Sequence, residues 1–286
     1  MICLLEWANA YLDFCKRRFV RNTYKEKVYA FRLFFRSVSS SMSIDELNKG
    51  HVLAHFTGPN CEGCSGNSLN RYRKDLVAAW NWGLRYLEGL PAENPFQIDR
   101  FSETRYPRYV PPLADFWAVL AQTESKQDYA FLLSYLYLAA RRSELFRLRI
   151  DDVDLERKLL RLGTKKRVDG SLEYNWLPIA DPLFPVLSEH LTTVSGPWVF
   201  PNPKTGTAYH ERAKWMKRLC AAAGVKPFGL HSVRHLTASL LAERGVPLVQ
   251  IQQILRHTRL TTTERYIRSL GGCRDAVAVL PSPSTV

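Results

Sequence analysis

The chain has 286 residues, with 40 lysines and arginines against 27 aspartates and glutamates, and a formal net charge of +13. At about 150 residues per domain this length suggests about two domains, each long enough to bury a core of its own. The cationic excess favours a polyanionic partner such as nucleic acid, because every phosphate that Lys or Arg neutralises releases a counterion. A basic surface without a special role is the alternative.

Hydropathy and cysteine usage exclude other classes. No run of about 18 apolar residues is present, so no transmembrane helix and no membrane partner is expected. The start of the chain, Met1 to Glu6, lacks a basic leader and does not read as a signal peptide. Six scattered cysteines fit a reducing cytosol better than a disulfide scaffold. We therefore expect a soluble, cytoplasmic protein.

Apolar residues in the first hundred positions recur at steps of three or four, the period of amphipathic helices. The pattern predicts four helices, over residues 1–20, 24–38, 44–57 and 68–87. Ser43 is the candidate N-cap of the third helix, with Glu46 three residues on. The second helix carries cations on its other face: Lys25, Lys27, Arg32 and Arg36. A solvated face or contact with DNA phosphates would explain them.

Prolines break the helical period after this unit. We interpret residues 101–112 as a basic interdomain linker, with a proline-rich loop inside one domain as the alternative. The rest of the chain predicts helices over residues 113–122, 128–139, 211–222, 232–244 and 247–256. Strands are expected over 158–162 and 173–179, joined around Asp169-Gly170. The predicted fold is therefore mainly α with a small β-sheet, in two domains over residues 1–100 and 113–286.

Three separated segments of the second domain carry candidate chemistry. They are Ala139-Ala140-Arg141-Arg142-Ser143-Glu144-Leu145, then His231-Ser232-Val233-Arg234-His235, then Leu255-Arg256-His257 followed nine residues later by Tyr266. On a helix, the spacing of His231 and Arg234 places both side chains on one face. Each segment alone has an ordinary explanation, such as a solvated helix start or a packed tyrosine. Their order along the chain is far more specific.

These segments resemble the tyrosine recombinase (phage integrase) family. That family carries an arginine in a box like the first segment, then His-x-x-Arg, then Leu-Gly-His, then a tyrosine nine residues later. The resemblance covers residues 110–270, and residues 1–100 are similar in pattern to the family's helical core-binding (SAM-like) domain. It implies two domains that clamp duplex DNA, the second being the catalytic domain.

The chain departs from the family pattern at two places. Arg256 replaces the usual glycine before the histidine, and Ala139-Ala140 stand where the family often has Thr-Gly. A glycine there relieves crowding near a helix end, so the substitution bears on the placement of His257. An extra cation beside DNA is an equally good interpretation of Arg256.

The resemblance implies a site-specific DNA recombinase in which Tyr266 is the nucleophile. The tyrosine displaces a 5′ hydroxyl and leaves a 3′-phosphotyrosyl link. Arg141 and Arg234 are the candidate clamp on the phosphate, because guanidinium groups stabilise its developing charge bidentately, and His257 is a further donor. A phenol has a pKa near 10, so a base must help, and His231 is the candidate.

The leaving oxygen needs a general acid, and the family uses a lysine in a β-hairpin. Lys165 is favoured over Lys166, because its spacing from the preceding strand matches better. The phosphotyrosine keeps the bond energy, so rejoining needs no ATP. Two arginines, a histidine and a lysine supply the charge, so no metal and no cofactor are expected.

The expected partners are double-stranded DNA and three further copies of the chain. The resemblance implies a homotetramer that exchanges strands through a Holliday junction in integration, excision or resolution of a mobile element. Whether accessory proteins set the direction stays open. A type IB topoisomerase is one rival, disfavoured by the small N-terminal helical unit. A relative that binds DNA without cutting is the other, disfavoured because all six catalytic candidates are present. The tail after Tyr266 either frays or docks on a neighbouring protomer.

One group of residues lies outside the family pattern. His51 and His55 are four apart, and Cys61 and Cys64 follow closely. Two histidines and two cysteines can hold zinc tetrahedrally in a structural site. Solvated histidines and loop thiols are the alternative.

Overall fold

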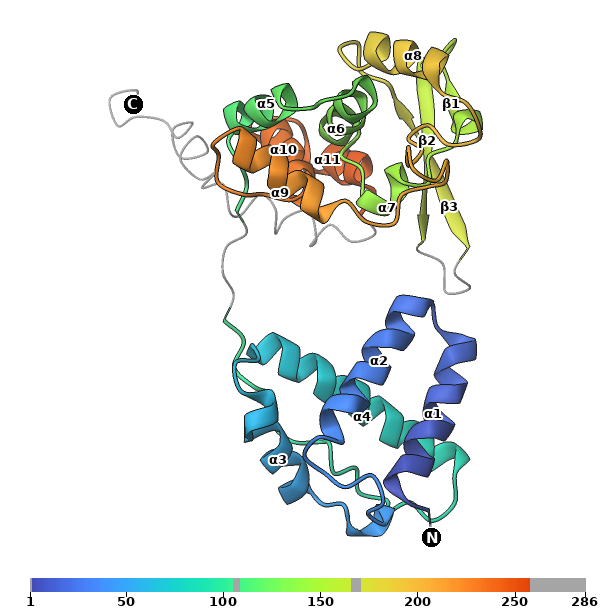
Figure 1. The fold of residues 1–286 in the computed structure, drawn as a ribbon, viewed down its shortest axis with the longest axis vertical. Coiled ribbons are helices and arrows are strands. Elements are labelled where there is room, and N and C mark those ends of the chain that lie inside the picture. The colour runs from blue at the N-terminus through green and yellow to red at the C-terminus, as the bar shows by residue number, and fades with distance from the viewer. Residues whose placement is uncertain (1, 105–108, 166–170, 258–286) are drawn as a thin grey trace, which may run out of the picture. The chain divides into compact units, whose positions relative to one another are not determined.

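The structure is a computed structural model that describes residues 2–104, 109–165 and 171–257. The chain divides into two compact units, Met1–Tyr106 and Pro107–Val286 (Figure 1). The described residues are mainly helical, with a three-stranded antiparallel sheet in the second unit, which confirms the predicted fold class. Within these ranges no helix is both long and apolar enough to cross a membrane.

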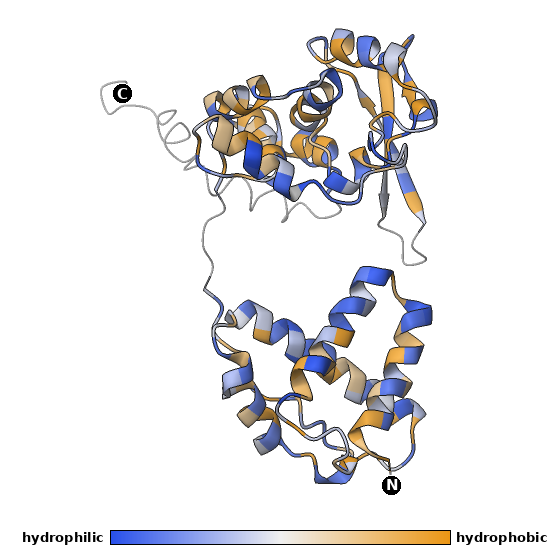
Figure 2. Cartoon of the chain, in the orientation of Figure 1, coloured by the Kyte–Doolittle hydropathy of each residue, from blue (hydrophilic) through white to orange (hydrophobic). Residues whose placement is uncertain are grey.

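The first unit consists of helices up to Tyr86, and its described residues 87–104 form no helix. Its elements are α1 (Leu4–Arg18), α2 (Arg21–Phe34), η1 (Ile44–Glu46), α3 (Lys49–Thr57), η2 (Pro59–Cys61) and α4 (Gly66–Tyr86). Aromatic side chains fill the core: the Trp7 ring lies 5.4 Å from Trp80 and 5.8 Å from Phe96, between ring centroids. Figure 2 shows the hydrophobic residues of these helices gathered on their mutually facing sides. Burial of this apolar face stabilises the helices predicted over residues 1–20, 24–38 and 68–87.

The prediction of one continuous helix over residues 44–57 is wrong. The chain forms the short 3₁₀-helix η1, extends at Leu47, and begins α3 only at Lys49. Asn48 is the N-cap of α3, its side chain accepting a hydrogen bond from the His51 N–H at 3.1 Å, whereas Ser43 caps no α-helix. Asn is as good an N-cap as Ser, so α3 can begin after Asn48. Burial of the Leu47 side chain stabilises the extended residue between η1 and α3.

The prediction of a basic face on α2 is wrong for one of its four cations, Lys27. Lys25, Arg32 and Arg36 are exposed, but Lys27 is buried, and its ammonium group lies 2.8 Å from the carboxylate of Asp75 on α4. A buried charge requires such a partner. Lys27 therefore joins α2 to α4 and is not part of a surface that meets phosphates.

The second unit places a small sheet beside a group of helices (Figure 1). Its elements are α5 (Leu113–Ala121), α6 (Lys126–Leu138), α7 (Arg142–Leu145), η3 (Ile150–Asp152), β1 (Val153–Asp154), β2 (Leu159–Lys165), β3 (Leu172–Pro178), α8 (Phe184–Thr193), α9 (Ala213–Ala222), α10 (Leu230–Glu243) and α11 (Leu248–Leu255). Helix α8 was not predicted, because Pro182 precedes it and Pro185 lies inside it. Pro185 stands in the first turn, where a missing N–H costs no hydrogen bond.

The sheet has the strand order β1-β2-β3. Strands β2 and β3 pair antiparallel from Leu159 opposite Pro178 to Lys165 opposite Leu172. Strand β2 therefore runs three residues beyond its predicted end. The predicted turn at Asp169-Gly170 lies outside the described residues.

Helix α6 is the buried centre of the second unit. Nearly all of its side chains from Ala130 to Leu138 are buried, and α10 packs against it, with the Thr237 hydroxyl donating to the Leu136 carbonyl at 2.7 Å. A small apolar cluster beyond the end of α6 adds α11 to this pair: Ala139, Ala238, Ile251 and Leu255. This packing brings the ends of α6 and α11 together.

Candidate functional site

Arg141 lies in the sharp connection between α6 and α7. Ala139 ends α6 in the left-handed region with φ 44°, and Arg141 is the N-cap of α7 with extended backbone. The Arg141 side chain keeps 31% of its surface exposed. Three residues after the buried helix α6, the chain therefore presents a guanidinium group that a ligand can reach.

The carboxylate of Glu144 organises this connection. One oxygen accepts hydrogen bonds from the Arg141 guanidinium at 2.8 Å and from the Thr164 hydroxyl at 2.6 Å. The other accepts from the Arg141 backbone N–H at 2.7 Å and from the Arg256 guanidinium at 2.8 Å. Glu144 thereby joins three segments that are far apart in the sequence.

The environment of Glu144 keeps it ionised. Burial alone would raise its pKa, but the Arg256 charge and the hydrogen bonds from Arg141 and Thr164 outweigh burial and lower the pKa from 4.5 to about 2. Burial lowers the pKa of Arg256, and the charge of Glu144 opposes that change. Glu144 and Arg256 therefore form a buried ion pair in which both groups are charged.

Arg234 lies on α10 and is completely buried. Its two terminal nitrogens donate to the carbonyls of Ala139 and Leu255. The same Ala139 carbonyl accepts from Arg256 at 3.2 Å. Arg234 therefore braces the ends of α6 and α11, and any contact of Arg234 with phosphate stays a prediction.

His231 stands in the first turn of α10, one turn before Arg234. Helix α10 begins two residues before the helix predicted over 232–244 and so includes both residues, but His231 is exposed where Arg234 is buried. The His231 ring meets the His235 ring edge-on, with centroids 4.8 Å apart.

The end of α11 presents His257. Arg256 closes the helix in the left-handed region with φ 53°, and the His257 N–H donates to the Gln252 carbonyl at 3.1 Å. The Gln252 side chain donates back to the His257 carbonyl at 3.0 Å. A cavity of about 530 Å³ lies between β3 and this end of α11, and His257 is among its lining residues. The backbone of His257 is thus fixed beside an opening.

Arg256 points inward. Its guanidinium donates to the Leu138 and Ile254 carbonyls at 3.2 and 2.8 Å, besides Glu144 and Ala139, and its side chain is 1% exposed. The interpretation of Arg256 as an extra cation beside DNA is therefore wrong. A buried carboxylate on the neighbouring segment draws the side chain into the protein.

The structure brings together Arg141, Arg234 and the backbone of His257, and places His231 one helical turn from Arg234. The backbone of Lys165 ends β2, one residue after Thr164, which contacts Glu144. Tyr266 and Lys166 lie outside the described residues. Their roles stay predictions.

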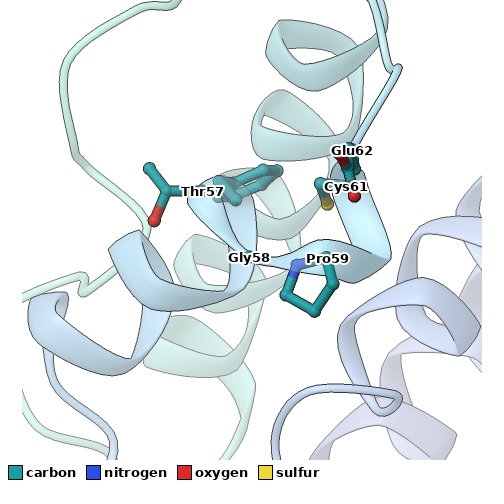
Figure 3. A pocket seen from close by; sticks show the side chains of 6 residues that line it. Thr57, Gly58, Pro59, Cys61 and Glu62 are labelled. Atoms are coloured by element: carbon teal, nitrogen blue, oxygen red, sulfur yellow. The ribbon is translucent and has the colours of Figure 1, made fainter.

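The four residues of the zinc hypothesis do not gather. The His55 and Cys61 side chains lie 3.8 Å apart, and the other ring nitrogen of His55 lies 2.9 Å from the Ser37 hydroxyl. Figure 3 shows Cys61 on the turn that follows Pro59. Among the described residues, no three His, Cys, Asp or Glu side chains are grouped to hold a metal ion. His55 is instead a core residue, and burial lowers its pKa to about 4.

The comparison with known families decides the classification of the chain. The sequence profile of the phage integrase family matches residues 110–271, more than half of the chain. The chain belongs to the phage integrase family. The resemblance deduced from Arg141, His231-x-x-Arg234 and the segment from Leu255 to Tyr266 is thereby confirmed.

Curated relatives of this integrase are tyrosine recombinases. It is 27% identical over 266 residues to the tyrosine recombinase of Thermosipho africanus, a match that covers 88% of this chain and 90% of that protein. It is 28% identical over 235 residues to the tyrosine recombinase XerA of Thermococcus kodakarensis, covering 78% of each.

Solved structures of integrases on DNA share the fold. The Tn1549 transposon integrase in complex with a circular intermediate DNA has a TM-score of 0.77 at 16% identity, covering 98% of this chain and all of that one. A lambda integrase tetramer bound to a Holliday junction has a TM-score of 0.77 at 15% identity, covering 94% of this chain and 78% of that one. At such identities the likeness shows the fold alone.

Sequence reasoning missed two residues of the site, Glu144 and Arg256. Glu144 carried a signal, because it stands three residues after the N-cap Arg141, the spacing of a capping box. Arg256 was marked only as a departure from the family pattern. Nothing in the periodicity indicates that the two side chains meet.

The Glu144 pair makes the stability of the integrase depend on pH. Because the pKa of Glu144 falls from 4.5 to about 2 on folding, its contribution is present above about pH 4.5 and lost as pH falls through about 2. We expect this group alone to remove about 3 kcal/mol of unfolding free energy across that window. Urea unfolding of the wild type and Glu144→Gln at several pH values measures it. An equal loss in both proteins would contradict the assignment.

Proposed function

We propose that this integrase is a site-specific recombinase that cleaves and rejoins duplex DNA through Tyr266. The Tyr266 oxygen attacks a DNA phosphorus, the bond to the 5′ oxygen breaks, and a 3′-phosphotyrosyl link forms. Lys165 supplies the proton that the leaving 5′ hydroxyl needs, and His231 accepts the proton of the phenol. A 5′ hydroxyl from another strand reverses the step and joins the new pair of ends.

The observation that carries the proposal is the partly exposed Arg141 held beside His257. Glu144 fixes the Arg141 guanidinium through one terminal nitrogen. The other terminal nitrogen of Arg141 donates to the Arg256 carbonyl at 3.2 Å, one residue before His257. Donors fixed in advance stabilise the charge that develops on the non-bridging phosphate oxygens. The order of the family motifs along the chain supports the same chemistry.

The assembly follows from the family. In this proposal the N-terminal unit is the core-binding domain, residues 101–112 are the linker, and the second unit is the catalytic domain. Four protomers pair two DNA sites and exchange strands through a Holliday junction. A lambda integrase tetramer on such a junction shares the fold of this chain, which supports the assembly.

Replacement of the nucleophile tests the proposal. Tyr266→Phe removes only the attacking oxygen, so we expect it to keep DNA binding and to lose covalent attachment entirely. The measurement is a denaturing gel of protein mixed with a nicked suicide substrate, taken from sequence that flanks the gene. A covalent band with the wild type alone is expected. Binding without any covalent band from the wild type would favour a relative that occupies DNA without cutting it.

Two neighbouring arginines give a matched test of the clamp. Arg141→Ala should slow covalent attachment about 100- to 1000-fold, because it removes a fixed donor to the phosphate. Arg142→Ala should leave the rate unchanged, because Arg142 pairs with exposed Glu211 at 2.9 Å on the surface. Single-turnover rates on the suicide substrate measure both. Equal rates for the two variants would refute the role of Arg141.

A further inference from the structure

Arg256 occupies a backbone position that disfavours its own side chain. With φ 53° and ψ 43° it lies in the left-handed region at the end of α11, where its N–H donates to the Gln253 carbonyl at 3.0 Å. Glycine is the residue that ends helices in this conformation without strain. An arginine here therefore needs a compensating interaction.

The compensating interaction is the contact with Glu144. The two charged groups lie 2.8 Å apart with side chains 1% exposed. The same guanidinium also donates to the carbonyls of Leu138, Ala139 and Ile254. Arg256 thus links the end of α6, the start of α7 and the turn before His257.

Charge balance in this cluster bears on Arg141. Glu144 contacts two guanidinium groups, those of Arg141 and Arg256. Of these two contacting cations, Arg256 is buried and Arg141 is partly exposed, so Arg256 is the cation that offsets the Glu144 charge inside the protein. Without Arg256, the carboxylate would neutralise Arg141 and would oppose a phosphate beside it.

We propose that Arg256 is a positioning residue of the cleavage site. It balances the charge of Glu144, so that the charge of Arg141 toward a DNA phosphate is not offset by the carboxylate, and it fixes the turn that presents His257. This inference rests on the proposed function and deepens it. Arg256 itself does not touch the phosphate.

A matched pair of substitutions isolates the charge. Arg256→Lys keeps a cation and Arg256→Met removes it, and both carry the same left-handed backbone. On the nicked suicide substrate, we expect Arg256→Met to slow covalent attachment about 10- to 100-fold and Arg256→Lys to keep most of the rate. Thermal unfolding of each variant checks its fold. If Arg256→Met does not fold, Arg256→Gly replaces it, because glycine relieves the backbone strain.

A second substitution distinguishes charge balance from a merely structural role. Glu144→Gln in the wild type should slow attachment, because Arg141 loses its anchor. In the Arg256→Met background, the same Glu144→Gln should speed attachment several-fold, because it removes the unbalanced negative charge. Equal rates for Arg256→Met and Arg256→Lys would overturn the proposal. So would a Glu144→Gln effect of the same size and sign in both backgrounds.

DNA binding gives a readout that does not depend on cleavage. The slope of log affinity against log salt falls by about one for each phosphate that the protein no longer neutralises. Arg256→Met should lower the slope as much as Arg141→Ala does, while Arg256→Lys should keep it. If the wild type forms no covalent complex, the proposed cleavage fails, and these slopes still decide the role of Arg256. An unchanged slope in Arg256→Met would refute it.

Discussion

The buried carboxylate of Glu144 is the group on which the arrangement of the site depends. A charge taken out of water is tolerated only when it is paired and hydrogen-bonded. Glu144 meets this requirement with Arg141 at the start of α7, Thr164 on β2 and Arg256 at the end of α11. Three elements that are remote in sequence must therefore meet at one point, and that point carries Arg141 and the backbone of His257.

Of the three non-glycine residues with positive φ among the described residues, two lie at this place and the third, Lys158, lies between β1 and β2. Ala139 and Arg256 both have left-handed backbone, at φ 44° and 53°, a conformation that costs an L-residue about 1–2 kcal/mol. The Ala139 carbonyl accepts hydrogen bonds from both Arg234 and Arg256. The guanidinium groups thus hold the two strained helix ends together. Strain that surrounding contacts maintain is common where a site must be rigid before its substrate arrives.

The sequence predicted the elements whose pattern is local. Strong helical periods gave α1, α2 and α4, and the motif order gave the family. The break between η1 and α3 was missed because burial of Leu47 and the N-cap Asn48 cause it. Helix α8 was missed because proline in its first turn is not typical of a helix interior. The Arg256–Glu144 contact joins residues 112 apart. No local period encodes such a contact, so the interpretation of Arg256 as a cation beside DNA was open from the sequence, although the side chain is buried.

The central claim is that Tyr266 forms the covalent link to DNA. Mass spectrometry of the trapped complex, after digestion with nuclease and protease, tests it most directly. We expect the peptide containing Tyr266 to carry a nucleotide joined through its 3′ phosphate, with the phenolic oxygen as the attachment point. Attachment to another residue, or through a 5′ phosphate, would contradict it.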